Sequence, residues 1–458
     1  MNPTIFSVLE KVDVVVLGSG PAGLAVAYSL IEEGKEILFI DQGANTKNFF
    51  TSDSQNSLEQ SVGGIGGVAK AWGGQCATFT KHDELLWRTA ISSSSWNQLE
   101  RGIEAIASYI QVPIRRFNMY KSLDKNFQKI IKVDQNFELL HTVYASNLDF
   151  DKLFASVLQS KLVHFYEAEV VKIQLENQTI LNQIILQSGE ILEVKQKQVF
   201  LALGTLATTR LISESSLDVF AIQNRVLDHP QAYVMEIIGK LPWRLRKSSY
   251  FRSGDNFFKR KIVYTEEFRE CTFEIHIDIG SLRKLILNRK TNKLFICQVL
   301  HYITNYVGTK IFHRPLTSKC RNLVWIQIDQ LPGESNNNVS SITKPTTHWE
   351  VDAQDFEFIK RATNNFGELL KSNKVENFRI FSKEEVELTL THSFHPSSTI
   401  ELRFEKKGGL ANRLGSPNIN ANFAVVSAAV FPFSGWINPT LIIMGFAYAS
   451  AKKMVSKL

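Results

Sequence analysis

A glycine-rich turn at residues 18–23, with the sequence GSGPAG, constrains the fold of this chain more than any other segment. An apolar run at 12–17 precedes the turn, and an amphipathic stretch at 24–33 follows it. A second apolar run, 37–40, then ends in Asp41. This order predicts a strand, a tight turn, a helix and a second strand with an acidic end, which is the start of a dinucleotide-binding fold.

Each glycine of the turn has a separate physical role. Gly18 permits the sharp turn, Gly20 lets the backbone approach a pyrophosphate, and Gly23 lets the helix pack against the strand. The phosphates then meet free N–H groups and the positive dipole end of the helix. Asp41 lies about twenty residues further on, where a carboxylate can bind a ribose hydroxyl. A strand–helix turn without a ligand is the alternative, but the complete pattern favours an adenine dinucleotide.

The sequence around the turn, VLGSGPAGL, resembles an FAD fingerprint more than an NAD fingerprint. Spacing alone does not separate the two cofactors, so this preference rests on the resemblance. The residues expected to contact the cofactor here are Gly18, Gly20, Pro21, Ala22, Gly23, Asp41 and Gln42.

A second glycine-rich segment, residues 63–74, carries six glycines. Such a density is incompatible with the interior of a helix or strand, and indicates a loop against which a large planar ligand can lie. A flexible surface loop is the alternative, but the interleaved Ile65, Val68 and Trp72 argue against it because a solvated linker would be polar. The expected cofactor contacts here are Gly67, Trp72, Gly73 and Gly74.

The bulk properties are typical of a soluble globular protein. The chain has 458 residues, enough for two or more domains, with 44% hydrophobic and 21% charged residues. Its four cysteines, Cys76, Cys271, Cys297 and Cys320, form no C-x-x-C pair, which argues against a zinc site or a disulfide framework. Residues 1–11 lack the pattern of a signal peptide. We therefore expect a reducing, cytoplasmic location.

Two segments raise the question of a membrane or an acidic partner. Residues 424–450 are almost free of charge, but Pro432, Gly435 and Pro439 interrupt them, so we predict a buried strand, turn and helix rather than a membrane span.

Residues 240–320 carry 17 Lys and Arg against 6 Asp and Glu, a net charge of +11. This excess could face an anionic substrate, an acidic partner protein or a membrane surface, or be a solvated face. No motif indicates nucleic-acid binding.

The strand–glycine–helix pattern returns far along the chain. An apolar strand is predicted at 199–204, ending in Gly204, and a helix at 205–213. A dinucleotide-binding domain assembled from separated segments is implied, with insertions that form a second domain. The remaining predicted elements are strands at 137–144, 163–175, 180–187, 232–238, 271–279 and 324–328, helices at 100–110, 356–371 and 441–451, and helical stretches within 282–306.

Several short motifs occur in one order along the chain. They are GG at 66–67, WGG at 72–74, ALG at 202–204, DHP at 228–230, DQLP at 329–332 followed by Asn338, HSFHPSST at 392–399, VFP at 430–432 and GWINPT at 435–440. In this order they resemble the glucose–methanol–choline (GMC) oxidoreductases, which use FAD. The resemblance spans nearly the whole chain, and it is specific jointly although no single motif is.

The resemblance implies an α/β fold in which a Rossmann-like FAD-binding domain is assembled from residues 1–115, 155–230 and 390–458. A substrate-binding domain of α+β type, with an antiparallel sheet and helices, would comprise 116–154 and 231–389. The family's catalytic pair falls on His395 and Asn438. Further cofactor contacts implied by the resemblance are Val170 and Val171 at the adenine, Gly204, and Asn438, Pro439 and Thr440 at the start of the last helix.

The residue types of this pair suit the oxidation of an alcohol, which removes a hydroxyl proton and passes a hydride to flavin N5. A neutral imidazole with a pKa near 6.5 suits the proton step, so His395 is the expected base. Asn438 can bind the alkoxide without competing for the proton. It also precedes Pro439 as a helix N-cap would, and both roles are compatible. A metal pair of His392 and His395 is disfavoured because Pro396 argues against a helix there.

The sequence departs from the family pattern at two informative positions. Many relatives have Gly-Thr soon after the catalytic His-Pro, where this chain has Ser398-Thr399. Relatives with covalently attached flavin carry His or Cys in the glycine-rich loop, where this chain has Ala71. We therefore predict that FAD is bound non-covalently.

The expected function is FAD-dependent oxidation of an alcohol group on a sugar, a glycoside or a secondary-metabolite intermediate. Oxygen or another compound could be the electron acceptor, and the sequence does not choose between them. Two other classes stay open. One is a non-redox flavin-dependent lyase or isomerase on the same fold, and the other is a non-catalytic protein that binds flavin or a partner.

Overall fold

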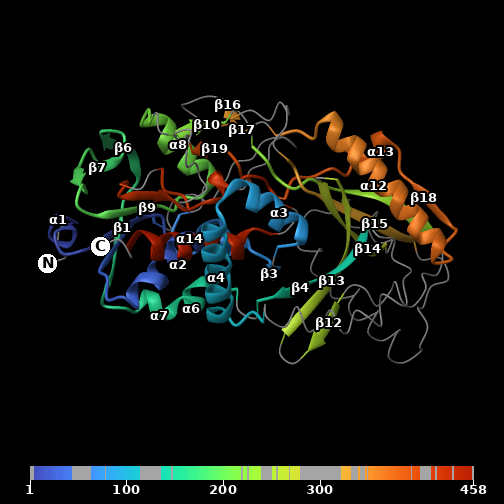
Figure 1. Cartoon of the computed structure of the whole chain (residues 1–458), viewed down its shortest axis with the longest axis horizontal. Helices are drawn as coiled ribbons and strands as arrows, with labels where there is room; N and C mark the ends of the chain where they lie inside the picture. The colour runs from blue at the N-terminus through green and yellow to red at the C-terminus, as the bar shows by residue number, and fades with distance from the viewer. Residues whose placement is uncertain are drawn as a thin grey trace, which may run out of the picture.

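The computed structural model has two β-sheet bodies side by side in an elongated molecule (Figure 1). A parallel sheet with its helices forms one end, where both chain termini also lie, and a large antiparallel sheet with helix α12 forms the other. The structure describes residues 5–43, 63–77, 79–113, 136–145, 148–217, 220–223, 226–238, 250–253, 256–267, 269–278, 321–331, 339–340, 346–347, 349–393, 395–402, 414–417, 420–435 and 438–455.

The parallel sheet has the order β20-β9-β1-β2-β5. All its neighbouring strands run parallel, with Val14 opposite Ile37 on one side and opposite Gln198 on the other. The central strand β1 is fully buried, and β9 is buried except for its first residue, as expected for a parallel sheet covered on both faces. The bounds are β1 (Val14–Leu17), β2 (Ile37–Asp41), β5 (Val163–Glu167), β9 (Gln198–Leu201) and β20 (Phe423–Val425). The predicted α/β fold is thus confirmed.

The single strand predicted at 163–175 is wrong, because the structure divides it between two sheets. β5 extends the parallel sheet beside β2, whereas β6 (Val170–Glu176) pairs antiparallel with β7 (Ile180–Leu186), which pairs with β8 (Ile191–Glu193). The chain changes direction at Ala168, whose N–H donates to the carbonyl oxygen of Asp41. Alternation of apolar residues is the same in both strands, so the sequence pattern does not reveal the break.

Helix α14 (Thr440–Val455) is buried against α2 (Pro21–Ile31) and α4 (Ser93–Tyr109). Gly445 and Gly102 let α14 and α4 approach closely, since a Cβ on Gly102 would lie 2.3 Å from the carbonyl oxygen of Gly445. The predicted buried strand, turn and helix of 424–450 are therefore confirmed as β20 and α14. Within the described part of the chain, no helix combines the length and the apolar character needed to cross a membrane.

The antiparallel sheet has the order β18-β11-β15-β14-β13-β4-β3, with β12 also paired to β13. Its bounds are β3 (Gln75–Cys76), β4 (Phe137–Tyr144), β11 (Gln231–Ile238), β12 (Tyr250–Ser253), β13 (Asn256–Glu266), β14 (Arg269–Asp278), β15 (Arg321–Ile328) and β18 (Phe378–Ile380). The amphipathic helix predicted at 356–371 is α12 (Ala353–Ser372), which covers one face of this sheet, with Phe366 stacked on Phe273 at 4.3 Å between ring centroids.

The opposite face of the antiparallel sheet is polar. Side chains alternate between the faces of a strand, so Lys261, Glu274 and Gln327 lie opposite their apolar neighbours Ile262 and Phe273. Lys261 contacts the Glu274 carboxylate at 3.0 Å and donates to Gln327 at 3.3 Å. The charged groups are almost fully buried, so this face is a protein interior that carries charge.

The remaining described elements complete the fold. They are α1 (Ile5–Leu9), η1 (Gly67–Ala71), α3 (Lys81–Ala90), α6 (Phe150–Leu153), α7 (Ala155–Leu158), α8 (Thr205–Glu214), β10 (Phe220–Ile222), β16 (Val339–Ser340), β17 (Thr346–Thr347), α13 (Lys383–Glu387), β19 (Ile400–Leu402) and η4 (Ala428–Val430). The helical stretches predicted within 282–306 and most of the basic region 240–320 lie outside the described residues.

Candidate active site

One cavity of about 730 Å³ collects nearly all the residues that the sequence singled out. This volume is within the range of about 300–1,000 Å³ typical of cofactor and ligand pockets. The predicted residues that line it are Gly18, Gly20, Pro21, Ala22, Asp41, Gln42, Gly67, Trp72, Gly73, Val170, Val171, Gly204, His395, Asn438, Pro439 and Thr440. Gly23 and Gly74 are not part of its lining.

The turn between β1 and α2 has the geometry that a phosphate-binding turn requires. Gly18 has a φ of +96°, in the left-handed region that favours glycine, and its N–H donates to the carbonyl oxygen of Ile40. Gly23 packs directly on Gly18. A Cβ on Gly20 would meet no atom within 4 Å, so it would project into the open cavity. The turn thus leaves room for a ligand at the N-terminus of α2, which fits a pyrophosphate.

The carboxylate of Asp41 organises the loops around this turn. Its Oδ2 accepts hydrogen bonds from the N–H and the hydroxyl of Ser19, both at 2.8 Å. Its Oδ1 accepts from the N–H groups of Gly43 at 2.9 Å and Gly64 at 2.7 Å. Asp41 therefore connects the glycine-rich turn to the second glycine segment. The ribose contact expected of Asp41 stays a prediction.

The cavity wall offers a further donor to a bound cofactor. The indole of Trp72 is buried, and its Nε1–H finds no hydrogen-bond partner among the described residues. A buried donor without a partner costs free energy of about 1–3 kcal/mol, which a ligand acceptor can recover. This orphaned donor and the empty space at Gly20 both fit a large polar cofactor such as FAD.

Cys76 contributes nothing to the cavity. Its thiol is fully buried and donates weakly to the carbonyl oxygen of Gly74, and burial raises its pKa far above the ordinary value. It is not among the described residues that line the cavity. The backbone of Ala71 ends η1, and non-covalent attachment of the flavin stays a prediction.

His395 reaches the cavity from the segment after α13. The bridge between Leu227 and Ser397 fixes the backbone there. The ring is partly open to the cavity but closely surrounded by protein, and this burial lowers the pKa of His395 to about 4. The imidazole is therefore neutral at pH 7 and has a lone pair with which to accept a proton.

Asn438 reaches the cavity from the start of α14. Its Oδ1 accepts hydrogen bonds from the Thr440 N–H at 3.4 Å and the Thr440 hydroxyl at 2.9 Å. Because the N–H of Thr440 is a donor, the oxygen of the amide must face the helix, and the NH₂ group faces the other way. Asn438 therefore caps the helix and keeps its Nδ2 donors for another acceptor.

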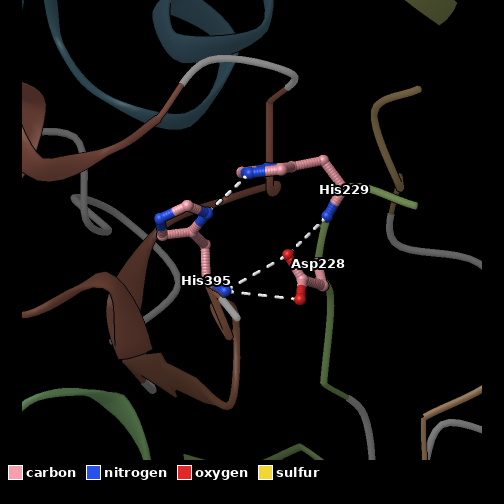
Figure 2. A group of neighbouring side chains, drawn as sticks. All are labelled: Asp228, His229 and His395. Atoms are coloured by element: carbon pink, nitrogen blue, oxygen red, sulfur yellow. Dashed lines mark hydrogen bonds between the residues drawn. The ribbon is translucent and has the colours of Figure 1, made fainter. Parts of the chain in front are cut away.

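The sequence reasoning missed the residues that hold His395 in place. The carboxylate of Asp228 accepts hydrogen bonds from the backbone N–H groups of His229 at 2.7 Å and His395 at 3.3 Å (Figure 2). It also accepts one from the N–H of Ser393 at 3.1 Å. The ring of His229 contacts the ring of His395, Nε2 to Nδ1, at 2.8 Å. The signal was present, because His229 and His395 both precede a proline in motifs that carried the family resemblance.

A second missed residue, Gln330, connects this segment to the antiparallel sheet. Its Oε1 accepts hydrogen bonds from the N–H of Asp228 at 3.0 Å and from Trp349 Nε1 at 2.9 Å. Its Nε2 donates to Asp355 on α12 at 2.9 Å. Gln330 thus links the backbone beneath the histidine pair to the helix that covers the far face of the sheet.

Asp228, His229 and His395 lie close enough together to suggest a metal site. The geometry argues against one. Two imidazole nitrogens bound to one tetrahedral zinc at about 2.0–2.1 Å would be roughly 3.3 Å apart, further than the 2.8 Å between these two rings. The described bonds of the Asp228 carboxylate also go to backbone N–H groups. The two nitrogens therefore share a proton.

Comparison with known proteins agrees with this picture. Residues 13–57 match the family of FAD binding domains. The crystal structure of pyridoxine 4-oxidase from Mesorbium loti superposes with a TM-score of 0.58 at 12% identity, covering 97% of this chain and 99% of that chain. Formate oxidase superposes with a TM-score of 0.55 at 11% identity, covering 97% and 98%. No curated protein matches the sequence.

These matches define the class of protein. The chain has the fold of an FAD-dependent oxidoreductase, and FAD, predicted from residues 18–23, is confirmed by the family match over that segment. The family match agrees with the FAD cofactor that the resemblance to the GMC oxidoreductases implies, and the solved structures agree with its fold.

Proposed function

We propose that this chain oxidises an alcohol group of a small molecule with FAD as its cofactor. One observation carries the proposal: the neutral ring of His395 and the amide of Asn438 line the same cavity as the glycine-rich turn at residues 18–23. A proton acceptor and a hydrogen-bond donor thus lie in the cavity that fits the cofactor. Bound FAD would supply the acceptor for the hydride that leaves the carbinol carbon.

His395 is the base in this proposal. Its Nδ1 contacts His229, so Nε2 is the ring nitrogen left to accept the hydroxyl proton. The burial that keeps the imidazole neutral also makes it a weak base, with a pKa of about 4. An isolated alcohol would not give up its proton to such a base. We therefore infer that proton transfer accompanies cleavage of the carbon–hydrogen bond, because loss of the hydride makes the hydroxyl strongly acidic.

Asn438 stabilises the substrate oxygen. Its Nδ2 donors are free of Thr440, since the amide oxygen is held by that residue at the start of α14. A donor fixed in advance stabilises negative charge that develops on oxygen without the cost of reorganisation. The N-terminus of α14 adds a positive dipole end at the same position. Asn438, Pro439 and Thr440 would in this way serve both substrate and cofactor.

We propose that the chain is divided into one domain that binds FAD and a second domain that binds the substrate. Residues 1–115, 155–230 and 390–458 would form the FAD-binding domain, with Gly18, Gly20, Asp41 and Trp72 at the cofactor. Residues 116–154 and 231–389 would form the substrate domain. The charge of Lys261 on the buried polar face of the antiparallel sheet contributes to the lowered pKa of His229, whose ring contacts the proposed base. A sugar, a glycoside or a secondary-metabolite intermediate is the substrate class that we propose from the family resemblance.

The proposal is tested by the visible spectrum of the FAD-loaded protein, mixed without oxygen with a panel of alcohols, sugars and glycosides. An active compound should bleach the oxidised-flavin band and be recovered as a product with two hydrogens fewer. A compound converted to an isomer or to fragments while the flavin stays oxidised would contradict alcohol oxidation and indicate a lyase or isomerase. Failure to bind FAD at all would contradict the whole assignment.

A matched pair of variants assigns the base. His395→Ala should slow bleaching by about 10²-fold or more, because general base catalysis contributes roughly 10²–10⁴-fold. His392→Ala is the control. His392 is a buried histidine three residues earlier that packs edge-on against Trp349 and is not part of the cavity lining. Equal loss of rate in both variants would mean that the effect is structural.

A further inference from the structure

The two imidazole rings behind the cavity are in direct contact. Nε2 of His229 lies 2.8 Å from Nδ1 of His395, with 4.8 Å between ring centroids. His229 is fully buried, and Figure 2 shows the second ring nitrogen of His395 pointing away from it. The hydroxyl of Ser393 donates to the carbonyl oxygen of His229 at 2.7 Å, and Asp228 binds the backbone of both histidines. The contact is therefore held from both sides.

A hydrogen bond between two neutral imidazoles contains one proton, and its position decides what His395 can do. If His229 Nε2 carries the proton, His395 accepts it at Nδ1 and must carry its own proton on Nε2, where it is a donor. If His395 Nδ1 carries the proton, its Nε2 has a free lone pair and is a base. The tautomer of His229 thus selects between an acid and a base at the cavity.

We propose that His229 accepts a hydrogen bond from the Nδ1–H of His395 and so keeps Nε2 of His395 unprotonated, as a positioning residue for the base. The inference rests on the proposed role of His395. His229 would take the part that a carboxylate plays toward the histidine of a serine protease, where it orients the ring and fixes its tautomer. His229 then carries its own proton on Nδ1.

The tautomer of His229 follows from this contact and from the role proposed for His395. Burial lowers the pKa of His229 well below its ordinary value, and His395 and Lys261 lower it further, so the ring is neutral and carries one proton. If Nε2 of His395 is the base, its Nδ1 carries the proton, and Nε2 of His229 accepts that hydrogen bond at 2.8 Å. The proton of His229 then lies on Nδ1, which makes no hydrogen bond to a described residue.

Burial and the nearby charge of Lys261 also imply that His229 does not take up the proton that leaves the substrate. A second proton would put a positive charge in a fully buried ring near the ammonium of Lys261, which holds an ion pair with Glu274 at 3.0 Å. That charge is costly to bury. His229 therefore stays neutral when His395 takes the substrate proton at Nε2. It accepts a stronger, charge-assisted hydrogen bond from the Nδ1–H of His395 at that moment.

The direct test is ¹⁵N nuclear magnetic resonance of the FAD-loaded protein with labelled histidine, which reads the tautomer of each ring without any substrate. We expect both His229 and His395 to carry their proton on Nδ1. The resonances are assigned with variants in which one histidine at a time is replaced. A proton on Nε2 of His395 would overturn the proposal, even if the protein proved to be an alcohol oxidase. So would zinc bound by His229 and His395 after addition of Zn²⁺ at one equivalent.

Two substitutions then separate positioning from packing. His229→Gln keeps an acceptor near His395, whereas His229→Leu removes it and should move the proton of His395 to Nε2. With a compound that bleaches the wild-type flavin, we expect a loss of about 10²-fold or more for His229→Leu, partial recovery in His229→Gln, and no loss in His392→Leu. Equal bleaching by wild type and His229→Leu would overturn the proposal. If no compound bleaches the flavin, the proposed function fails, while the tautomer in the wild-type protein still decides the inference.

Discussion

The backbone of Gly18 leaves no space for a side chain at Gly23. A Cβ atom at position 23 would lie 2.1 Å from the carbonyl oxygen of Gly18 and 3.2 Å from the ring of Phe39. Since Gly18 directly follows β1 and Gly23 lies in the first turns of α2, the helix can approach the end of the strand this closely only without a side chain at position 23. The close packing of strand and helix therefore sets where the N-terminus of α2 points.

Gly23→Ala should consequently destabilise the protein and abolish FAD binding. We expect a loss of about 2 kcal/mol or more in urea unfolding, since the overlap is with backbone atoms that move only together with the sheet. Gly20→Ala is the matched control. Gly20 has a φ of −70° and open space where a Cβ would lie. The free energy of unfolding of Gly20→Ala should therefore differ from that of the wild type by less than about 1 kcal/mol, while FAD binding weakens. Equal stability of the two variants would contradict this account.

Ser398 has a φ of +60°, in the region that favours glycine, at the position where the family pattern has glycine. Its hydroxyl donates to the carbonyl oxygen of Phe431 at 2.7 Å, which offsets a strain of about 1–2 kcal/mol. The free energy of unfolding of Ser398→Gly should therefore lie within about 1 kcal/mol of the wild-type value, because the substitution removes both the backbone strain and the hydrogen bond. Ser398→Ala keeps the strain, and a melting temperature as high as that of Ser398→Gly would be the contrary result.

Glu274 should contribute stability that disappears in acid. Burial alone would raise its pKa, but Lys261, Lys259 and a hydrogen bond from His276 together hold the pKa of Glu274 well below its ordinary value. A lowered carboxyl pKa stabilises the fold at pH values above the unfolded pKa of about 4.3, and this contribution is lost as the pH falls through the folded pKa. Glu274→Gln should cost about 3 kcal/mol at pH 7, because it leaves two ammonium groups without a charge partner.

The control for Glu274 is Glu266, which pairs with Arg361 at 3.1 Å nearer the surface. Glu266→Gln should cost less than about 1 kcal/mol at every pH. Urea unfolding between pH 7 and pH 3 measures both variants. A gap between wild type and Glu274→Gln that persisted undiminished to pH 3 would show that charge is not its origin.

The pH dependence of stability contributed by Asp83 should have the opposite sign to that of Glu274. Burial raises the pKa of this carboxyl to about 6, although hydrogen bonds from Thr80 and the nearby His82 oppose the shift. A raised carboxyl pKa destabilises the fold above that pKa, so the wild type should gain stability as the pH falls from 7 toward 5. Asp83→Asn should be at least as stable at pH 7 and should lack that gain. Asp83→Ala loses the capping box with Thr80 and should be the least stable variant.

The parallel sheet could be predicted from the sequence because its signals are local. Glycine spacing, apolar runs and an acidic strand end identify β1, α2 and β2, and the apolar run before Gly204 identifies β9. The division of 163–175 into β5 and β6 could not be predicted, since both strands have the same alternation. The break lies at Ala168, whose N–H donates to the carbonyl oxygen of Asp41 at the end of β2, a contact between segments far apart in the sequence.

The site was predictable as a set of residues but not as a set of contacts. His395 and Asn438 were identified from motifs, and both line the cavity. The contact between His229 and His395 joins positions 166 residues apart, and only the folded backbone around Asp228 brings them together. The rotation of the Asn438 amide likewise depends on a single N–H at Thr440. Local patterns name such residues, whereas tertiary packing determines their chemistry.

The measurement that tests the central claim most directly is the rate of anaerobic flavin bleaching by an alcohol in wild type and in His395→Ala, each loaded with FAD. The account predicts that the flavin of the wild type is bleached and that the oxidised product is released. It predicts that His395→Ala binds FAD normally, but that its flavin is bleached at least about 10²-fold more slowly. Bleaching of both proteins at the same rate would contradict the assignment of His395 as the base.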